Sequence, residues 1–148
     1  MALIENKKAY FDYNIQERYE AGIELLGIEV KSLRAKHASL EGAHVTVRGG
    51  EAYLVGATIN PYQPNNIPKG YDATRNRRLL LTKGEIGELA KAEDTKGLTI
   101  VPISVYNKNK KLKLEIGVGV KKQKHDKRET LKKREADRDI ARDTKSFR

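Results

Sequence analysis

The stretch LTIVPISVYNKNKKLKLEIGVGV, residues 98–120, predicts a β-hairpin and with it the fold class. Its second half alternates strictly, as a half-buried strand does. Lys113, Glu115, Gly117 and Gly119 are expected to face outward, while five apolar residues face the core: Leu112, Leu114, Ile116, Val118 and Val120. Polar residues 107–110 are expected to turn the chain back between the two strands.

A further hairpin is predicted by AHVTVRGGEAYLVGATI, residues 43–59. Gly49 and Gly50 suit a two-residue turn in which both central residues take positive φ. That turn fixes the register of the two strands and places Arg48 opposite Glu51 as a favourable cross-strand pair.

Two helices are expected outside these hairpins. The first begins at Asn14 and ends near Gly27, because one helical face would hold Ile15, Tyr19, Gly22, Ile23 and Leu26. The second begins with a capping box at Thr82 and ends near Gly97. Residues 28–31 alternate as a strand does, and residues 60–78, rich in Pro and Asn, are predicted to form a loop.

These elements predict a mainly β protein, a small closed barrel of the oligonucleotide-binding (OB) type. It would have about six strands, two to three flanking helices and a basic C-terminal tail. Residues 1–120 would form the barrel body and residues 121–148 the tail. The tail carries twelve Lys or Arg against six Asp or Glu and few apolar side chains. It is therefore expected to be disordered when free, since it cannot offset the entropy of ordering itself.

Charge and composition narrow the class of partner. The net charge is +10, of which the tail supplies +6 and the body +4. A basic excess of this kind favours nucleic acid over a small acidic substrate. The chain has no cysteine, no run suited to a signal peptide and no apolar stretch of about 20 residues. A cytoplasmic protein that does not bind membranes is expected.

The sequence gives little indication of catalysis. His37, His44 and His125 lie far apart, without metal-binding spacing. No Ser lies in a nucleophile elbow, and no glycine-rich loop precedes a helix to hold phosphate. We expect no enzymatic activity, cofactor or metal. A Mg²⁺-dependent nuclease remains an alternative, in which acidic residues such as Asp12, Glu20 and Glu29 would chelate the ion.

Basic residues indicate a nucleic-acid surface on the body. Lys31 is expected on the polar side of the strand predicted at residues 28–31, with Ser32 and Arg34 close by. A solvated strand face is the alternative explanation of these three residues, and on their own they favour it slightly over phosphate contact. Arginine guanidinium groups suit phosphate geometry, and further residues would extend the basic surface: Asn6, Lys7, Lys8, Arg75, Arg77 and Arg78. The pattern does not distinguish RNA from DNA.

Four segments, in order and spacing, resemble one family, the small protein B (SmpB) family, partner of transfer-messenger RNA (tmRNA). They are EAGIELLGIEVKSLRA at 20–35, GEAYLVGATI at 50–59, TRNRRLLL at 74–81 and KKQKHDKR at 121–128. The resemblance implies an OB-type barrel without enzymatic activity. It also implies that the chain binds the tRNA-like domain of tmRNA and delivers it to stalled ribosomes for trans-translation. A general RNA binder on the same barrel is the alternative.

The resemblance also implies which residues bind RNA. The surface facing tmRNA would consist of Asn6, Lys7, Glu20, Lys31, Ser32, Arg34, Arg75, Arg78 and Leu80. Glu20 would either accept hydrogen bonds from the RNA or orient a basic neighbour.

In the tail, ribosome contacts would come from Lys121, Lys122, Lys124, His125, Lys127, Arg128, Lys132, Lys133 and Arg134. The tail would enter the vacant mRNA channel of the small subunit as a helix, with His125 near the decoding centre. The implied partners are tmRNA, the ribosome through its small-subunit rRNA, and elongation factor Tu bound to alanyl-tmRNA, with the protein itself a monomer.

Overall fold

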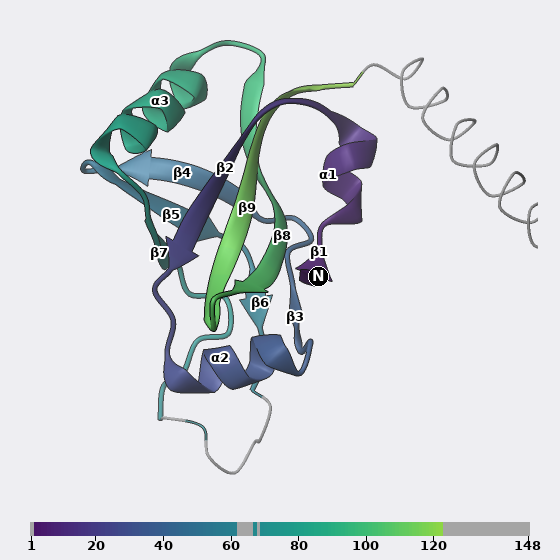
Figure 1. Cartoon of the computed structure of the whole chain (residues 1–148), viewed down its shortest axis with the longest axis vertical. Coiled ribbons are helices and arrows are strands. Elements are labelled where there is room, and N and C mark those ends of the chain that lie inside the picture. Colours follow the sequence, from purple (N-terminus) through teal and green to yellow (C-terminus); the bar gives the residue numbers. More distant parts are fainter. Residues whose placement is uncertain (1, 62–66, 68, 123–148) are drawn as a thin grey trace, which may run out of the picture.

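The computed structural model describes residues 2–61, 67 and 69–122 (Figure 1). It contains three helices: α1 (Lys7–Asp12), α2 (Gly27–Arg34) and α3 (Lys83–Asp94). Its strands are β1 (Ala2–Glu5), β2 (Tyr13–Ile23), β3 (Ala38–Ser39), β4 (His44–Arg48), β5 (Glu51–Val55), β6 (Thr58–Ile59), β7 (Arg77–Leu80), β8 (Leu98–Lys108) and β9 (Lys111–Lys121). The mainly β class with flanking helices is confirmed, with nine described strands in place of about six.

Seven strands form one antiparallel sheet in the order β1-β8-β9-β2-β7-β5-β4, and β3 pairs with β6 in a small second sheet. Both edges of β8 are occupied, one by β1 and the other by β9. No ladder joins the outer strands β1 and β4 within the part of the chain that the structure describes. The predicted closed barrel is therefore not found, and the described sheet is open.

Both predicted hairpins are present. β4 and β5 pair with Arg48 opposite Glu51, and the intervening Gly49 and Gly50 have φ of +57° and +78°. In the β8–β9 hairpin the ladder continues to Lys108 opposite Lys111, so its turn is shorter than the predicted segment 107–110.

The strict alternation in β9 holds in its first half only. Leu112, Leu114 and Ile116 are buried as expected, but Val120 is exposed and the two glycines, predicted outward, are buried. The glycines pair in register with Arg18 and Ile15 of β2, whose ladder runs along almost the whole of β9. A Cβ at Gly119 would lie 2.4 Å from the carbonyl oxygen of Asn14, so this close approach of two backbones requires glycine.

The helix predicted from Asn14 is wrong, because residues 13–23 form strand β2. Residues spaced by four positions share one face in a strand as well as in a helix, so the spacing of Ile15, Tyr19 and Ile23 fits both. Residues 13–23 adopt the strand because they pair with β9 on one side and with β7 on the other. β-branched and aromatic side chains also favour it.

The strand predicted for residues 28–31 is wrong as well, because they lie within helix α2. The residues that this helix buries are Glu29, Ser32 and Leu33, at the spacing of a helix. The side chain of Glu29, named above among the carboxylates that would chelate Mg²⁺, is fully buried. The hydrophobic pattern could not reveal the buried face of α2, since one of its three residues is charged and another is polar.

The predicted capping box at Thr82 is confirmed. The Thr82 hydroxyl accepts a hydrogen bond from the Glu85 backbone N–H at 3.2 Å, and the Glu85 carboxylate accepts one from the Thr82 N–H at 3.1 Å. Helix α3 then buries Leu89 in the core and ends before Gly97. None of the described helices is long and apolar enough to span a membrane.

Replacing Gly119 with Ala is expected to lower the free energy of unfolding by about 1–3 kcal/mol, because the new methyl group meets the Asn14 carbonyl. Gly87 gives a matched control, since it lies exposed in α3 with nothing within 4 Å of a built Cβ. Gly87→Ala should raise stability by about 0.5–1 kcal/mol. Denaturant unfolding of both variants tests this, and equal effects would contradict it.

Candidate nucleic-acid interface

A buried carboxylate organises the elements beside the candidate interface. Glu29 of α2 accepts hydrogen bonds from the Leu26 backbone N–H at 2.8 Å and from the Tyr71 hydroxyl at 3.1 Å. It also forms ion pairs with the guanidinium groups of Arg75 and Arg77. Burial acts to raise the pKa of Glu29, but the hydrogen bonds from Arg75, Leu26 and Arg77 outweigh it and hold this pKa below its ordinary value.

Arg77 was expected to extend the basic surface, and this is wrong. Its side chain is fully buried at the start of β7, where Nη2 lies 2.6 Å from Glu29 Oε2. The same guanidinium donates to the carbonyl oxygens of Ala57 at 2.8 Å and Ala73 at 3.0 Å. Arg77 is therefore a structural cation that connects α2, β7 and the chain around residues 57 and 73.

Arg75 keeps access to solvent. Its side chain is 31% exposed, and its Nε and Nη2 both donate to the Glu29 carboxylate. The carboxylate thus carries one negative charge against two guanidinium groups, which leaves a net positive charge at this point. Only the Arg75 side is open to a ligand, since Arg77 is enclosed.

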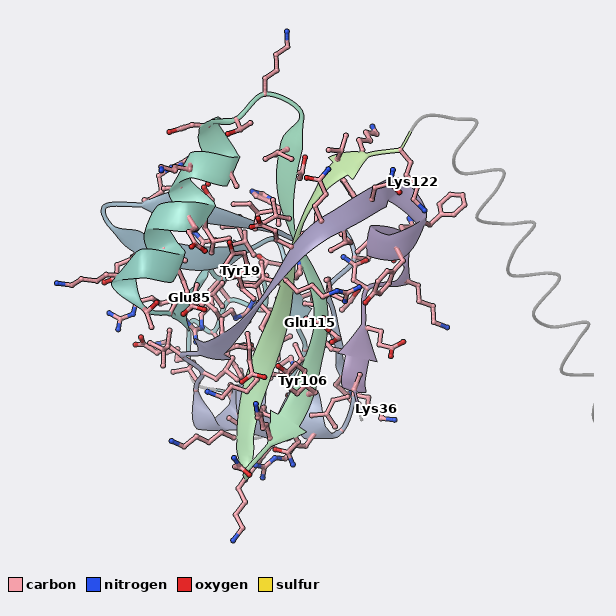
Figure 2. The ribbon with its side chains drawn as sticks, turned by 45° about the horizontal axis from the view of Figure 1, so that its top comes forward. Tyr19, Lys36, Glu85, Tyr106, Glu115 and Lys122 are labelled. Atoms are coloured by element: carbon pink, nitrogen blue, oxygen red, sulfur yellow. The ribbon has the colours of Figure 1, made fainter. Side chains whose placement is uncertain are left out.

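The outer face of the sheet is the face of β8, β9, β2 and β7 that points away from the core. Glu20 lies on it in β2, where its carboxylate accepts hydrogen bonds from the Tyr106 hydroxyl and from Lys108 Nζ at 3.1 Å. These two donors lower the pKa of Glu20. Figure 2 shows Tyr106 over β8 and Glu115 over β9 on the same side. This geometry favours the hypothesis that Glu20 orients a basic neighbour.

A groove of about 310 Å³ lies between α2 and the β8–β9 hairpin. Its basic lining comes from both elements: Arg34, Lys110, Lys111 and Lys113. Its apolar lining includes Gly22, Val30 and Leu80, and Leu80 is 48% exposed. A positive rim around an apolar, glycine-lowered floor suits a phosphate backbone and the flat face of a base or ribose.

Sequence reasoning missed the lysines of the β8–β9 hairpin. Lys113 pairs in register with Gly22 of β2, and Gly22 in turn lies opposite Leu80 of β7. The alternation of β9 did predict that Lys113 faces outward. Its neighbours could not be found, however, because residues 13–23 were predicted to be a helix.

The three residues predicted to form a surface on α2, Lys31, Ser32 and Arg34, differ in their exposure. Lys31 and Arg34 are exposed, and Arg34 reaches toward the Lys110 carbonyl oxygen at 3.4 Å. Ser32 is fully buried, and its hydroxyl donates to the Ile28 carbonyl at 2.9 Å. Ser32 thus supports the helix, and the exposed cations lie on either side of it.

The remaining predicted contacts lie at different places on the body. Asn6 is 8% exposed and donates its side-chain amide to the Pro102 carbonyl at 3.0 Å, while Lys7 is exposed on α1. Arg78 is half-exposed in β7 and lies 3.2 Å from a Glu24 carboxylate oxygen. Asn6 is thus an anchor of the first helix in this structure.

Most of the predicted tail contacts lie outside the described residues. Lys121 is exposed at the end of β9, and Lys122 contacts α1. The others are not described: Lys124, His125, Lys127, Arg128, Lys132, Lys133 and Arg134.

Metal-binding clusters are not found in the described part of the chain, where no three His, Asp or Glu side chains are placed to hold an ion. Two of the carboxylates considered for Mg²⁺, Glu20 and Glu29, are instead bonded to cationic side chains. Phosphate binding by the solvent-accessible cations is the chemistry that the site supports.

An antiparallel β sheet with a basic, apolar-floored groove on its outer face is the architecture of a small nucleic-acid-binding protein. The chain belongs to the SmpB protein family, whose model matches residues 3–146.

Individual relatives agree over nearly the whole chain. The SsrA-binding protein of Elusimicrobium minutum (strain Pei191) is 48% identical, with 95% of this chain and 89% of the relative covered. That of Ligilactobacillus salivarius (strain UCC118) is 46% identical, with 99% and 94% covered. A chain from the solved structure "tmRNA-SmpB: a journey to the center of the bacterial ribosome" superposes with a TM-score of 0.67 at 37% identity, covering 86% of this chain and 93% of that one.

Replacing Glu29 with Gln is expected to lower the free energy of unfolding by about 3–5 kcal/mol at neutral pH, because Arg77 stays buried without its charge partner. The pKa of Glu29 is lowered on folding, so its stabilisation is fully present above the ordinary value of 4.5 and is lost as pH falls through the folded-state pKa. The difference between wild type and variant should therefore narrow in acid. Denaturant unfolding across pH measures both effects.

Glu41→Gln is the matched control. Glu41 pairs with Lys8 at 2.7 Å on the surface, where both side chains are about two-thirds exposed. Its loss should change stability far less than the loss of Glu29 does, because solvent screens an exposed ion pair. If both variants behaved alike, the Glu29 cluster would not have the structural role given to it.

Proposed function

We propose that this protein binds the tRNA-like domain of tmRNA and delivers it to stalled ribosomes for trans-translation, acting as an RNA-binding protein without enzymatic activity. The observation that carries the proposal is membership of the SmpB family over residues 3–146. The relatives bear the name SsrA-binding protein, and the solved neighbour combines tmRNA and SmpB. The basic groove of this chain supplies a matching surface.

We place the tmRNA contact on the outer face of the sheet and on α2. Lys31 and Arg34 would bind phosphate groups, and Lys113 would join them from β9 across the groove. Leu80 and Gly22 would form its apolar floor. Glu20 would act by holding Lys108 and Tyr106 in place, and Arg75 would present the positive charge that Glu29 leaves uncompensated.

Further parts of the proposal concern architecture and partners. The sheet would be an OB-type barrel whose closure lies beyond the described ladders. Residues 121–148 would form a separate functional unit that enters the vacant mRNA channel near the decoding centre. The protein would act in the cytoplasm as a monomer, together with elongation factor Tu bound to alanyl-tmRNA.

Two alternatives predict different results. A general RNA binder would use the same groove without preferring tmRNA. A Mg²⁺-dependent nuclease would require free carboxylates, whereas Glu20 and Glu29 are engaged by Lys and Arg side chains. Incubation of RNA with protein and Mg²⁺ tests the nuclease alternative. RNA cleavage that is abolished by removing a carboxylate would overturn the non-enzymatic proposal.

Titration of tmRNA in the presence of excess tRNA tests the binding function. We expect tmRNA to bind more tightly than the competitor at fixed salt, and equal affinities would favour the general RNA binder.

A chain ending at Lys122 should keep most tmRNA affinity, because the groove lies within the body, yet lose tagging on stalled ribosomes. Loss of tmRNA binding on truncation would contradict this division between body and tail.

Replacing Lys31 and Arg34 together with Ala should weaken tmRNA binding and reduce its salt dependence. Each lost phosphate contact is expected to change the slope of log K against log salt by about 0.7–0.9. Lys91→Ala with Lys96→Ala provides a control of equal charge around α3, at the opposite end of the body from α2 (Figure 1). An equal change of slope in both double variants would mean that only net charge matters.

A further inference from the structure

Helix α1 is held to the body at its N-terminal end by Asn6. The Asn6 backbone N–H donates to the Ile103 carbonyl at 2.7 Å, and its side-chain amide donates to the Pro102 carbonyl at 3.0 Å. Ala9, one turn further, is 2% exposed. This short helix is therefore fixed against β8.

A second connection joins α1 to β2. Arg18 of β2 lies over the Tyr10 ring, 5.3 Å from its centre, and donates to the Tyr10 hydroxyl at 2.8 Å. Arg18 is itself paired with Glu115 of β9 at 2.7 Å. α1 is thus held by two neighbouring parts of the sheet.

The end of β9 is bonded to the last turn of this fixed helix. Lys122 donates its backbone N–H to the Asp12 carbonyl at 2.7 Å and its ammonium to the Tyr10 carbonyl at 3.0 Å. Figure 2 shows Lys122 beside α1 where β9 ends. Carbonyl groups at the end of a helix have no partner within the helix, so a lysine ammonium is a favourable one.

Lys121 differs from its neighbour although both carry the same charge. It is exposed, and its backbone pairs with Tyr13 as the last rung of the β2–β9 ladder. Lys122 follows that ladder and is half-buried against α1. Lys121 and Lys122 therefore carry the same charge but differ in their contacts. Comparing their variants distinguishes an effect of charge from an effect of the bond to α1.

We propose that Lys122 is a positioning residue that anchors the end of β9 to α1 and so fixes the direction in which the chain leaves the body. Its consequence for ribosome rescue rests on the proposed function of the tail. Lys122 would then act on the ribosome through this bond to α1, and Asn6 would act through the same helix, in place of direct RNA contacts.

The test uses the full-length chain with Lys122→Met, which removes the donor but keeps the apolar stem, Lys121→Met as the control of equal charge, and Lys122→Arg as the conservative variant. In the free protein, hydrogen exchange of the Lys122 amide should become about tenfold faster in Lys122→Met and stay unchanged in the other two. This measurement involves neither tmRNA nor ribosomes, so it tests the anchor independently of the proposed function.

On stalled ribosomes, Lys122→Met should lower the tagging rate several-fold more than Lys121→Met does, and Lys122→Arg should restore it. tmRNA affinity, its salt slope and the unfolding midpoint should be unaffected in all three. Since the chain has no cysteine, a cleavage probe on Ser146→Cys can report tail position. Its rRNA cleavage pattern should spread in Lys122→Met alone.

Three outcomes would overturn the proposal: unchanged exchange in Lys122→Met, equal loss of tagging in Lys121→Met and Lys122→Met, or an unchanged cleavage pattern. Equal loss would assign both lysines to simple charge contacts with rRNA. By contrast, a wild-type protein that failed to bind tmRNA or to support tagging would refute the proposed function and leave the exchange result standing.

Discussion

The described structure depends most on one buried charge, the carboxylate of Glu29. Removing such a group from water is costly, and the cost is offset only when its oxygens are fully hydrogen-bonded and its charge is paired. Glu29 meets this condition with Arg75, Arg77, Tyr71 and the Leu26 N–H. Because Tyr71, Arg75 and Arg77 come from β7 and the segment before it, helix α2 can occupy only one place at the end of the sheet. A purely apolar contact would allow the helix to slide or rotate, whereas a bidentate Arg–carboxylate pair has directional geometry.

The position of α2 in turn determines the shape of the groove. With Glu29 pointing inward, the helical repeat places Lys31 and Arg34 on the exposed side, and Arg34 reaches toward the tip of the β8–β9 hairpin. The hairpin supplies Lys110, Lys111 and Lys113 from the other side. Like charges brought this close repel one another, so the arrangement is costly in the free protein and becomes favourable when phosphate groups enter between them. The cations of the groove are carried by a helix and a hairpin whose backbones are already ordered. Less conformational entropy is therefore lost on RNA binding than if the lysines lay on a flexible segment.

Much of the fold could be predicted from residues that act locally. The Gly49-Gly50 turn, the capping box at Thr82 and the alternation of residues 112–116 each depend on a few neighbouring positions, and all three are confirmed. The errors at residues 13–23 and 28–31 have another origin. There, strand pairing over a distance of about 100 residues and a charged residue in the core decide the structure. A local sequence pattern contains no information on long-range strand pairing or on a charged residue in the core. The kinds of residue in the site could therefore be predicted, but the partners of Glu20, Glu29 and Arg77 could not.

The same two errors explain which candidate residues changed in character. The strand predicted for residues 28–31 placed Lys31 on its polar side with Ser32 and Arg34 close by. In helix α2, Ser32 and Glu29 turn inward and leave Lys31 and Arg34 exposed. The family resemblance names residues without distinguishing those that touch RNA from those that hold the surface in place. Burial and hydrogen bonding make that distinction for Asn6, Ser32 and Lys122, each of which is bonded to backbone carbonyl groups of the body. Under our proposal, such residues contribute to binding through the geometry that they impose on their exposed neighbours.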